Sequence, residues 1–215
     1  NFTLDLAGKT VASESSETGK NFNMFDVRGT MTVKSGTLTT EHVGTNMEWN
    51  NSTNVFNITA GGILNLVDVT AKNLGGSDMA FVAHLNNWGE CTLNVDNSTL
   101  ESPYIAVRVF NSGYDMNNVT ISNTTLGGKY CLWVHNYIDA GDSVGTDETL
   151  NFNIYNPAQN NIFNNTGKAP ILYGFDTPIC FDAQGNVLNF VENLEELQAA
   201  LEKEGQLRCV HGGAV

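Results

Sequence analysis

Residues 64–71 read Leu64-Asn-Leu66-Val-Asp68-Val-Thr70-Ala71, and six stretches of the chain can be aligned on this pattern. Each has two apolar residues two positions apart and then a small or Asx residue, followed in five of the six by a threonine and an apolar residue. The stretches begin at Leu4, Met31, Leu64, Leu93, Val119 and Phe152. The second apolar residue recurs every 26 to 33 positions, and self-similarity at such a period predicts a solenoid.

Each stretch is expected to form two strand segments joined by a bend. Apolar residues two positions apart face the same side of a strand, and Gly, Ser, Asn or Asp in the middle tolerates turn dihedrals. The threonine is predicted to stack on itself from coil to coil, an arrangement that suits strands. Its copies are Thr10, Thr37, Thr70, Thr99 and Thr125. No helical pattern separates the stretches before residue 190, so the coil is predicted to be all β.

A second strand with alternating apolar residues is predicted to precede each copy of the pattern. These segments are 25–27, 56–58, 81–83, 105–109, 132–134 and 171–173. The alternation assigns Phe25, Phe56 and Phe81 to the core. The connections that follow these strands lengthen along the chain, and insertions in a solenoid crowd one side, which commonly binds ligands. We call this predicted side the long-loop face.

Composition limits the classes of partner. The chain has 215 residues, of which only 15% are charged, and its net charge is −13. This acidic balance argues against nucleic acid and anionic membrane surfaces as partners. No apolar run approaches the ~20 residues that a membrane span needs. No signal peptide is visible, which predicts that the sequence begins as a mature form or as a piece of a longer protein.

The C-terminal region has a different pattern. Residues 193–204 predict an amphipathic helix with Leu194, Leu197 and Leu201 on one stripe, expected to cover the last exposed coil. Residues 206–215 then alternate like one more strand. The chain is therefore divided into a β-helix over residues 1–191 and a capping helix plus terminal strand over residues 192–215.

The segments Leu194-Glu-Glu-Leu-Gln-Ala-Ala-Leu201 and Phe2-Thr-Leu-Asp-Leu-Ala-Gly-Lys-Thr10 resemble right-handed parallel β-helix (pectate-lyase-like) modules of bacterial cell-surface and adhesin-like proteins. The resemblance implies a right-handed parallel β-helix of about six coils in a secreted or cell-surface protein. It specifies a fold and not an activity. In such modules the helix and strand precede the first coil, whereas here they lie at the C-terminus.

This order suggests an assembly. The terminal strand, with Leu207, Cys209 and His211, is expected to complete the N-terminal coil of a second copy or of a neighbouring β-helix unit. Such a head-to-tail contact does not close on itself and gives filaments or tandem arrays. The alternative is a boundary that cuts through a multi-unit protein. The leading prediction is thus a non-catalytic structural or adhesive module.

Catalytic residues are weakly indicated. Related β-helix lyases use a Lys or Arg base, and related hydrolases use clustered Asp residues. Arg108, with Asp115 or Glu101 nearby in sequence, is the best candidate base. A strand residue that is solvated or paired with an acid is the favoured interpretation of Arg108, and no catalytic signature supports an enzyme.

Binding of host or bacterial glycans is the alternative function, by a carbohydrate-binding or carbohydrate-active domain that uses the long-loop face. Sugar rings stack on aromatic faces while amide and carboxylate groups bind the hydroxyls. The candidate platforms are Trp49, Trp88, Trp133 and Tyr137. Each ring has the alternative of folding inward under a loop or capping a coil end.

The sequence predicts no cofactor, with calcium as the alternative. It does not decide between disulfides and free thiols for the cysteines. The acidic cluster of Asp139, Asp142, Asp147 and Glu148 could ligate calcium, although EF-hand spacing is absent and a solvated loop is favoured. The four histidines have no metal-ligand spacing.

The four cysteines permit two disulfides in a secreted chain or buried free thiols in a stacked core. They are Cys91, Cys131, Cys180 and Cys209.

Overall fold

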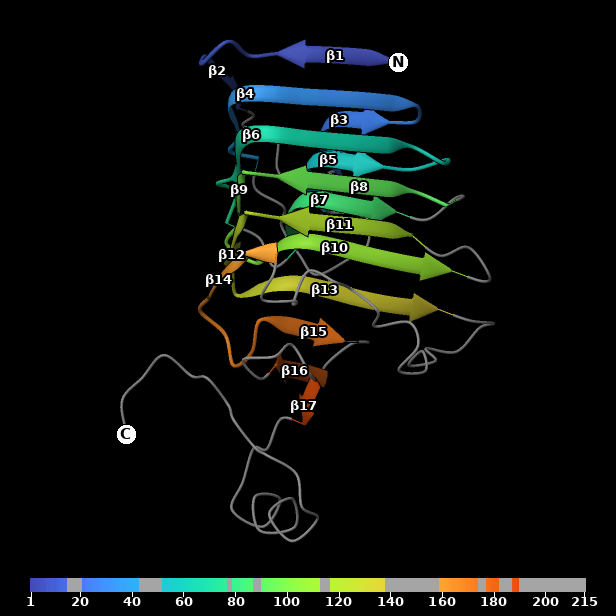
Figure 1. Cartoon of the computed structure of the whole chain (residues 1–215), viewed down its shortest axis with the longest axis vertical. Helices are drawn as coiled ribbons and strands as arrows, with labels where there is room; N and C mark the ends of the chain where they lie inside the picture. Colours follow the sequence, from blue (N-terminus) through green and yellow to red (C-terminus); the bar gives the residue numbers. More distant parts are fainter. Residues whose placement is uncertain are drawn as a thin grey trace, which may run out of the picture.

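The chain folds as an all-β parallel β-solenoid of about four turns, with its strands stacked along the long axis of the molecule (Figure 1). The computed structural model describes residues 1–14, 21–42, 52–76, 79–86, 90–112, 117–137, 159–173, 177–181 and 187–189. Within these residues the strands form two sheets that face each other across the core.

The first sheet contains nine strands, all paired in parallel in the described part of the chain. They are β1 (Phe2–Asp5), β2 (Thr10–Ser13), β4 (Thr30–Thr40), β6 (Ile63–Asn73), β8 (Thr92–Asp96), β9 (Thr99–Glu101), β11 (Asn118–Ser122), β12 (Thr125–Gly128) and β14 (Ile162–Asn165). The second sheet contains eight described strands. They are β3 (Phe22–Val27), β5 (Thr53–Ile58), β7 (Ala80–Asn86), β10 (Ile105–Ser112), β13 (Tyr130–Tyr137), β15 (Ile171–Tyr173), β16 (Thr177–Phe181) and β17 (Val187–Asn189).

The four middle stretches align in the register that the sequence predicts. Met31 pairs with Leu64, Leu64 with Leu93, and Leu93 with Val119. Together with β5, β7, β10 and β13 these stretches form the four complete turns. The predicted parallel β-helix is therefore confirmed as a parallel solenoid. The expected six coils become about four turns, because the first and last stretches contribute only short end strands.

The predicted bend and threonine ladder are confirmed. Ser35, Asp68, Asn97 and Asn123 have φ angles of 57°, 55°, 46° and 49°, which is the left-handed region that Asx residues tolerate. The side-chain amide of Asn97 donates to the carboxylate of Asp68 on the neighbouring turn. The five threonines of the repeat pair with one another on successive strands.

The first half of the first stretch is out of its predicted register, whereas Thr10 and Val11 pair with Thr37 and Leu38 as predicted. Phe2 and Leu4, and not Leu4 and Leu6, pair with Met31 and Val33. Ala7 and Gly8 both adopt positive φ, 48° and 76°, so the bend is longer here than in the other turns. Leu6 is buried at this bend against Gly36, where any side chain would clash with it.

The last stretch is also misplaced by the sequence pattern. Asn160, with φ of 52°, occupies the bend position predicted for Asn156, and Ile162 pairs with Thr125. Isoleucine stands where the other turns have threonine, so the residue that fixes the register elsewhere is missing. Residues 152–158 of the predicted stretch lie outside the described residues, but the bend and threonine positions predicted for Asn156 and Ala158 are occupied by Asn160 and Ile162.

After β15 the pairing of the described strands changes from parallel to antiparallel. β16 pairs with β15 in antiparallel fashion, and β17 pairs in the same way with β16. The repeat pattern predicted neither strand. The capping helix and terminal strand predicted within residues 192–215 lie outside the described residues, and so does the predicted domain boundary after residue 191.

Two cysteines lie in the described core. Cys91 and Cys131 are buried without a disulfide. Burial raises the pKa of the Cys131 thiol to about 12. Of the two alternatives for the cysteines, buried thiols in the stacked core hold for this pair. The side chain of Cys180 and all of Cys209 lie outside the described residues.

Candidate functional site

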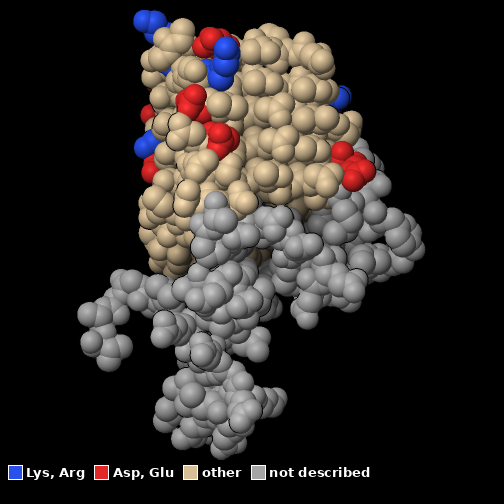
Figure 2. Space-filling model, viewed as in Figure 1, with Lys and Arg blue, Asp and Glu red and all other residues tan. Residues whose placement is uncertain are grey.

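The outer faces of the two sheets differ in exposure. In β6 of the first sheet, buried residues alternate with partly exposed ones. In β5 and β7 of the second sheet, nearly every residue is buried on both faces. On the face of the molecule that Figure 2 shows, charged side chains of the described residues are sparse and scattered. A ligand that contacts described strands therefore finds accessible side chains mainly on the first sheet.

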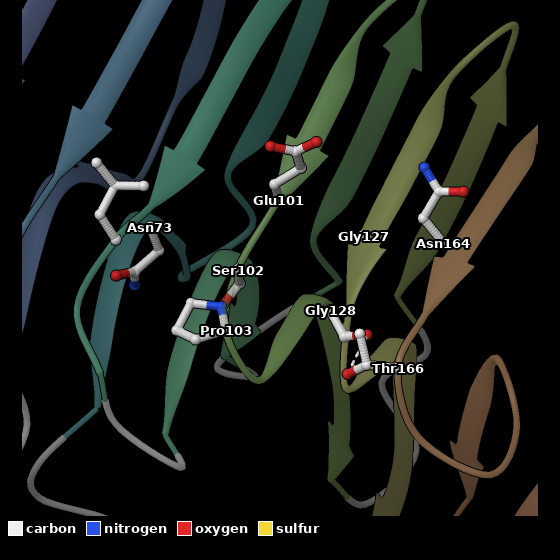
Figure 3. A pocket seen from close by; sticks show the side chains of 9 residues that line it. Asn73, Glu101, Ser102, Pro103, Gly127, Gly128, Asn164 and Thr166 are labelled. Carbon is white, nitrogen blue, oxygen red and sulfur yellow. Dashed lines mark hydrogen bonds between the residues drawn. The ribbon is translucent and has the colours of Figure 1, made fainter.

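A column of residues near the end of the first sheet contains a gap. Lys72, Glu101, Gly127 and Asn164 pair in this order on β6, β9, β12 and β14. Gly127 has no side chain, so a hollow remains between the side chains of Glu101 and Asn164, which rise from the same side of the sheet (Figure 3). The resulting groove has a volume of about 420 Å³. Its described lining comprises Asn73, Leu74, Glu101, Ser102, Pro103, Gly127, Gly128, Asn164 and Thr166.

The polar groups of the groove divide into two kinds. Asn73 and Ser102 are buried and hold the two sheets together. The Asn73 amide donates to the Thr53 carbonyl at 2.8 Å, and the Ser102 hydroxyl donates to the Ala80 carbonyl at 2.6 Å. Their hydrogen-bonding capacity is used by the fold, and so they are positioning residues for the groove wall.

The remaining polar groups face the hollow. Oε2 of Glu101 lies 2.6 Å from Nζ of Lys72, and both side chains are more than a third exposed. None of the described residues hydrogen-bonds to the side-chain amide of Asn164. Among the described residues, the Thr166 hydroxyl has one long contact, 3.5 Å, with the Gly128 carbonyl. Glu101, Asn164 and Thr166 are thus available to a ligand.

The predicted base Arg108 occupies a different place. It is buried on the outer face of the second sheet, where Nη1 lies 2.7 Å from Nε2 of His84. The guanidinium carbon lies 4.6 Å from the ring centroid of Trp133. Burial lowers the pKa of Arg108 to about 9. The favoured interpretation was that Arg108 is either solvated or paired with an acid. Because Arg108 is buried, the solvated alternative is wrong. Glu101 belongs to the other sheet.

Trp133 does not present a ring face to solvent. It is 5% exposed and packs with Phe81 and Tyr104 in a second hydrophobic cluster. This is the inward alternative considered for each aromatic ring. Phe81 is fully buried, as expected, but in this second cluster and not in the main core. Simple alternation fails here because two consecutive residues, Val82 and Ala83, both face the main core.

Most other predicted site residues lie outside the described parts of the chain. This holds for the sugar platforms Trp49 and Trp88 and for the candidate acid Asp115. It also holds for the calcium candidates Asp139, Asp142, Asp147 and Glu148 and for the assembly residues Leu207, Cys209 and His211. Tyr137 ends β13, but its side chain is not described.

Two further features of the described residues bear on ligands. They contain no cluster of three or more His, Cys, Asp or Glu side chains suited to a metal ion. The same residues include no helix with the length and apolar character to cross a membrane.

The N-terminal end of the solenoid has a second hollow. It has a volume of about 360 Å³ and lies between Phe2 and the turn from β3 to β4. Val11 pairs with Leu38, which is fully buried, yet Val11 itself is 40% exposed. Phe2 likewise pairs with the buried Met31 and is 58% exposed. Inward-facing residues of the first turn are therefore accessible at this end.

Comparison of the chain with protein-family models, with curated proteins and with solved structures gave no significant match. A function is therefore argued from the parallel solenoid and from the two hollows found among its described residues.

The groove over Gly127 was missed by the sequence analysis, although a signal for it exists. The repeat reads Thr99-Leu-Glu101 in one turn and Thr125-Leu-Gly127 in the next. A glycine inside a strand often marks a close approach to another molecule.

Proposed function

We propose that this chain is a non-catalytic structural or adhesive module that associates end to end through the open face of its first turn. We call this face the N-terminal face and define it by β1, β2 and β3. The observation that carries the proposal is the exposure of inward-facing residues there, above all Val11 and Phe2. Monomeric proteins normally cover such an end, because open strand edges template pairing with other chains.

The strand order supports the proposal. Within the described residues, β1 ends the strand path of the first sheet and β3 ends that of the second. Each therefore has an edge whose backbone N–H and C=O groups are paired with no described strand. A partner strand laid along this edge gains backbone hydrogen bonds and covers the apolar residues at the same time.

Side-chain ladders reach the same edge. The Asn54 amide donates to Asn23 at 2.7 Å, and the Asn57 amide donates to Asp26 at 2.8 Å. Both bonds run from β5 to the edge strand β3. A further solenoid turn that supplies amide side chains in the same columns extends these ladders by one step. A second copy of this chain, or a neighbouring β-helix unit, is the partner that such a repeating surface fits.

Three finer parts of the account belong to the same proposal. The donor is the C-terminal segment with Leu207, Cys209 and His211, in keeping with the family-like order of the helix and strand. The solenoid is right-handed, since crossover connections between parallel strands almost always have this hand. The protein is extracellular or bound at a cell surface, in keeping with the resemblance to bacterial adhesin-like modules.

Sedimentation velocity of the full chain over a range of concentrations tests the association. Val11→Lys places a charge on the N-terminal face, and Val67→Lys makes the same change at a valine of similar exposure, 38%, in the middle of the first sheet. We expect concentration-dependent oligomers that Val11→Lys abolishes and Val67→Lys retains. A chain that remains a strict monomer at high concentration would contradict the proposal.

A further inference from the structure

We infer that the groove over Gly127 binds an uncharged, hydroxyl-rich ligand, namely a segment of neutral glycan, without cleaving it. The groove lies where first-sheet strands end, and not on the long-loop face that the sequence favours. The inference does not depend on end-to-end association, because the groove and the N-terminal face involve different strands.

The shape of the site follows from one missing side chain. Glu101 and Asn164 are each one strand away from Gly127, so their backbones are about 10 Å apart at the usual strand spacing. Every other position of this column that borders the gap carries a side chain. The groove volume of about 420 Å³ lies within the range of small-molecule sites.

The polar groups match hydroxyls. The Glu101 carboxylate accepts hydrogen bonds, whereas the Asn164 amide and the Thr166 hydroxyl both donate and accept. A sugar hydroxyl is also both a donor and an acceptor, so it can bond to each of these groups. Leu74, which is 51% exposed, and Pro103 provide an apolar wall for the C–H face of a sugar ring.

The charges select a neutral ligand. Lys72 already neutralises Glu101 through their 2.6 Å contact. A uronate or phosphate would bring negative charge to a protein of net charge −13, and a cation would have to displace Lys72. An uncharged ligand is not repelled by the acidic protein and does not have to displace Lys72 from Glu101.

A peptide strand is a poorer occupant of this groove. Peptides that extend a sheet need an unpaired strand edge. The floor strand β12 is paired with β9 on one side and with β14 on the other. Hydrolysis is not part of the inference, because Glu101 is the one carboxylate among the described lining residues and glycosidases need two. None of those lining residues is aromatic, so we expect weak binding with a Kd of ~1 mM.

Titration of the full chain, followed by NMR or calorimetry, tests the site. The probes are cellohexaose, xylohexaose and mannohexaose, with hexagalacturonate as the acidic contrast. Gly127→Thr fills the gap, because a Cβ there lies 3.2 Å from Cγ of Glu101 and 3.9 Å from Cβ of Asn164, and threonine suits a strand. Val67→Thr is the control, since this 38% exposed residue in the middle of β6 is not among the described lining residues of the groove.

We expect at least one neutral hexasaccharide to bind, with affinity about tenfold weaker in Gly127→Thr and unchanged in Val67→Thr. Asn164→Ala removes a hydrogen-bonding group without occupying the groove, and it should weaken binding as well. This variant tests the site even if Gly127→Thr does not fold. Three results would overturn the inference: no neutral probe binds, hexagalacturonate alone binds, or both groove variants bind as well as the wild type.

Discussion

Arg108 donates a hydrogen bond to Nε2 of His84 at 2.7 Å, between neighbouring strands β10 and β7 of the second sheet. A guanidinium can only donate, so Nε2 must accept, and the neutral imidazole carries its proton on Nδ1. The pKa of His84 is held well below its usual range, first by burial and then by the charge of Arg108. The pair therefore requires an uncharged histidine in the fold.

This requirement predicts an acid-sensitive stability. The unfolded chain binds a proton at His84 near pH 6.5, and the folded chain binds it only at lower pH. The contribution of a neutral His84 is thus fully present above pH ~6.5 and is lost as the pH falls towards the folded-state pKa, by up to about 1.4 kcal/mol per pH unit. Urea unfolding at pH 7.5 and pH 5.5 measures it in the wild type and in His84→Gln. Equal pH dependence in the two proteins would contradict the assignment.

Arg108 is predicted to stabilise the fold and not to act as a base. Its guanidinium contacts the rings of Phe110 and Trp133, with distances of 5.0 and 4.6 Å to their centroids. Arg108→Ala removes these contacts and the bond to His84, and we expect a loss of about 2–4 kcal/mol in the free energy of unfolding. Arg108→Met keeps much of the packing, so its loss in chemical denaturation should be smaller. A fully stable Arg108→Ala protein would show that the cluster contributes little.

The left-handed bends predict an unusual tolerance to glycine. Asn97 has φ of 46°, where a β-branched residue is strained and glycine is not. We expect Asn97→Val to lower the free energy of unfolding by about 1–2 kcal/mol. Asn97→Gly loses only the side-chain bond to Asp68 and should be affected less. Thermal unfolding of both variants gives the order, and the reverse order would contradict the bend geometry.

The two core cysteines are predicted to be unreactive in the native state. Cys91 and Cys131 are buried, and the raised pKa of Cys131, about 12, leaves almost no thiolate at neutral pH. Peptide-resolved alkylation should label both residues after unfolding in urea and neither of them before it. Rapid native labelling of Cys131 would show that the strand around it opens.

The register of the solenoid could be read from the sequence only where the repeat contains a threonine in the expected context. Thr37, Thr70, Thr99 and Thr125 align as predicted, because a polar β-branched residue between apolar ones fixes both the face and the phase. Ile162 lacks this feature, and the last stretch was misplaced. Two extra residues in the bend around Ala7 and Gly8 shift the first half of the first stretch, while Thr10 still pairs with Thr37 as predicted.

The buried cluster of the second sheet could not be predicted from alternation. Val82 with Ala83, and Ala106 with Val107, face the main core as consecutive pairs. Each pair shifts the outward-facing positions of its strand by one residue. His84 and Arg108, which are paired on neighbouring strands, therefore both face outward. The groove over Gly127, in contrast, was within reach of the sequence, since it follows from one glycine in an otherwise regular column.

The most direct test of the proposed end-to-end association is hydrogen exchange of the full chain at low and high protein concentration. The account predicts that amides of the edge strands β1 and β3 become more protected at high concentration, while those of the central strand β6 do not change. Protection of the edge strands that does not depend on concentration, in the wild type and in Val11→Lys alike, would contradict the proposal that the N-terminal face binds another solenoid unit.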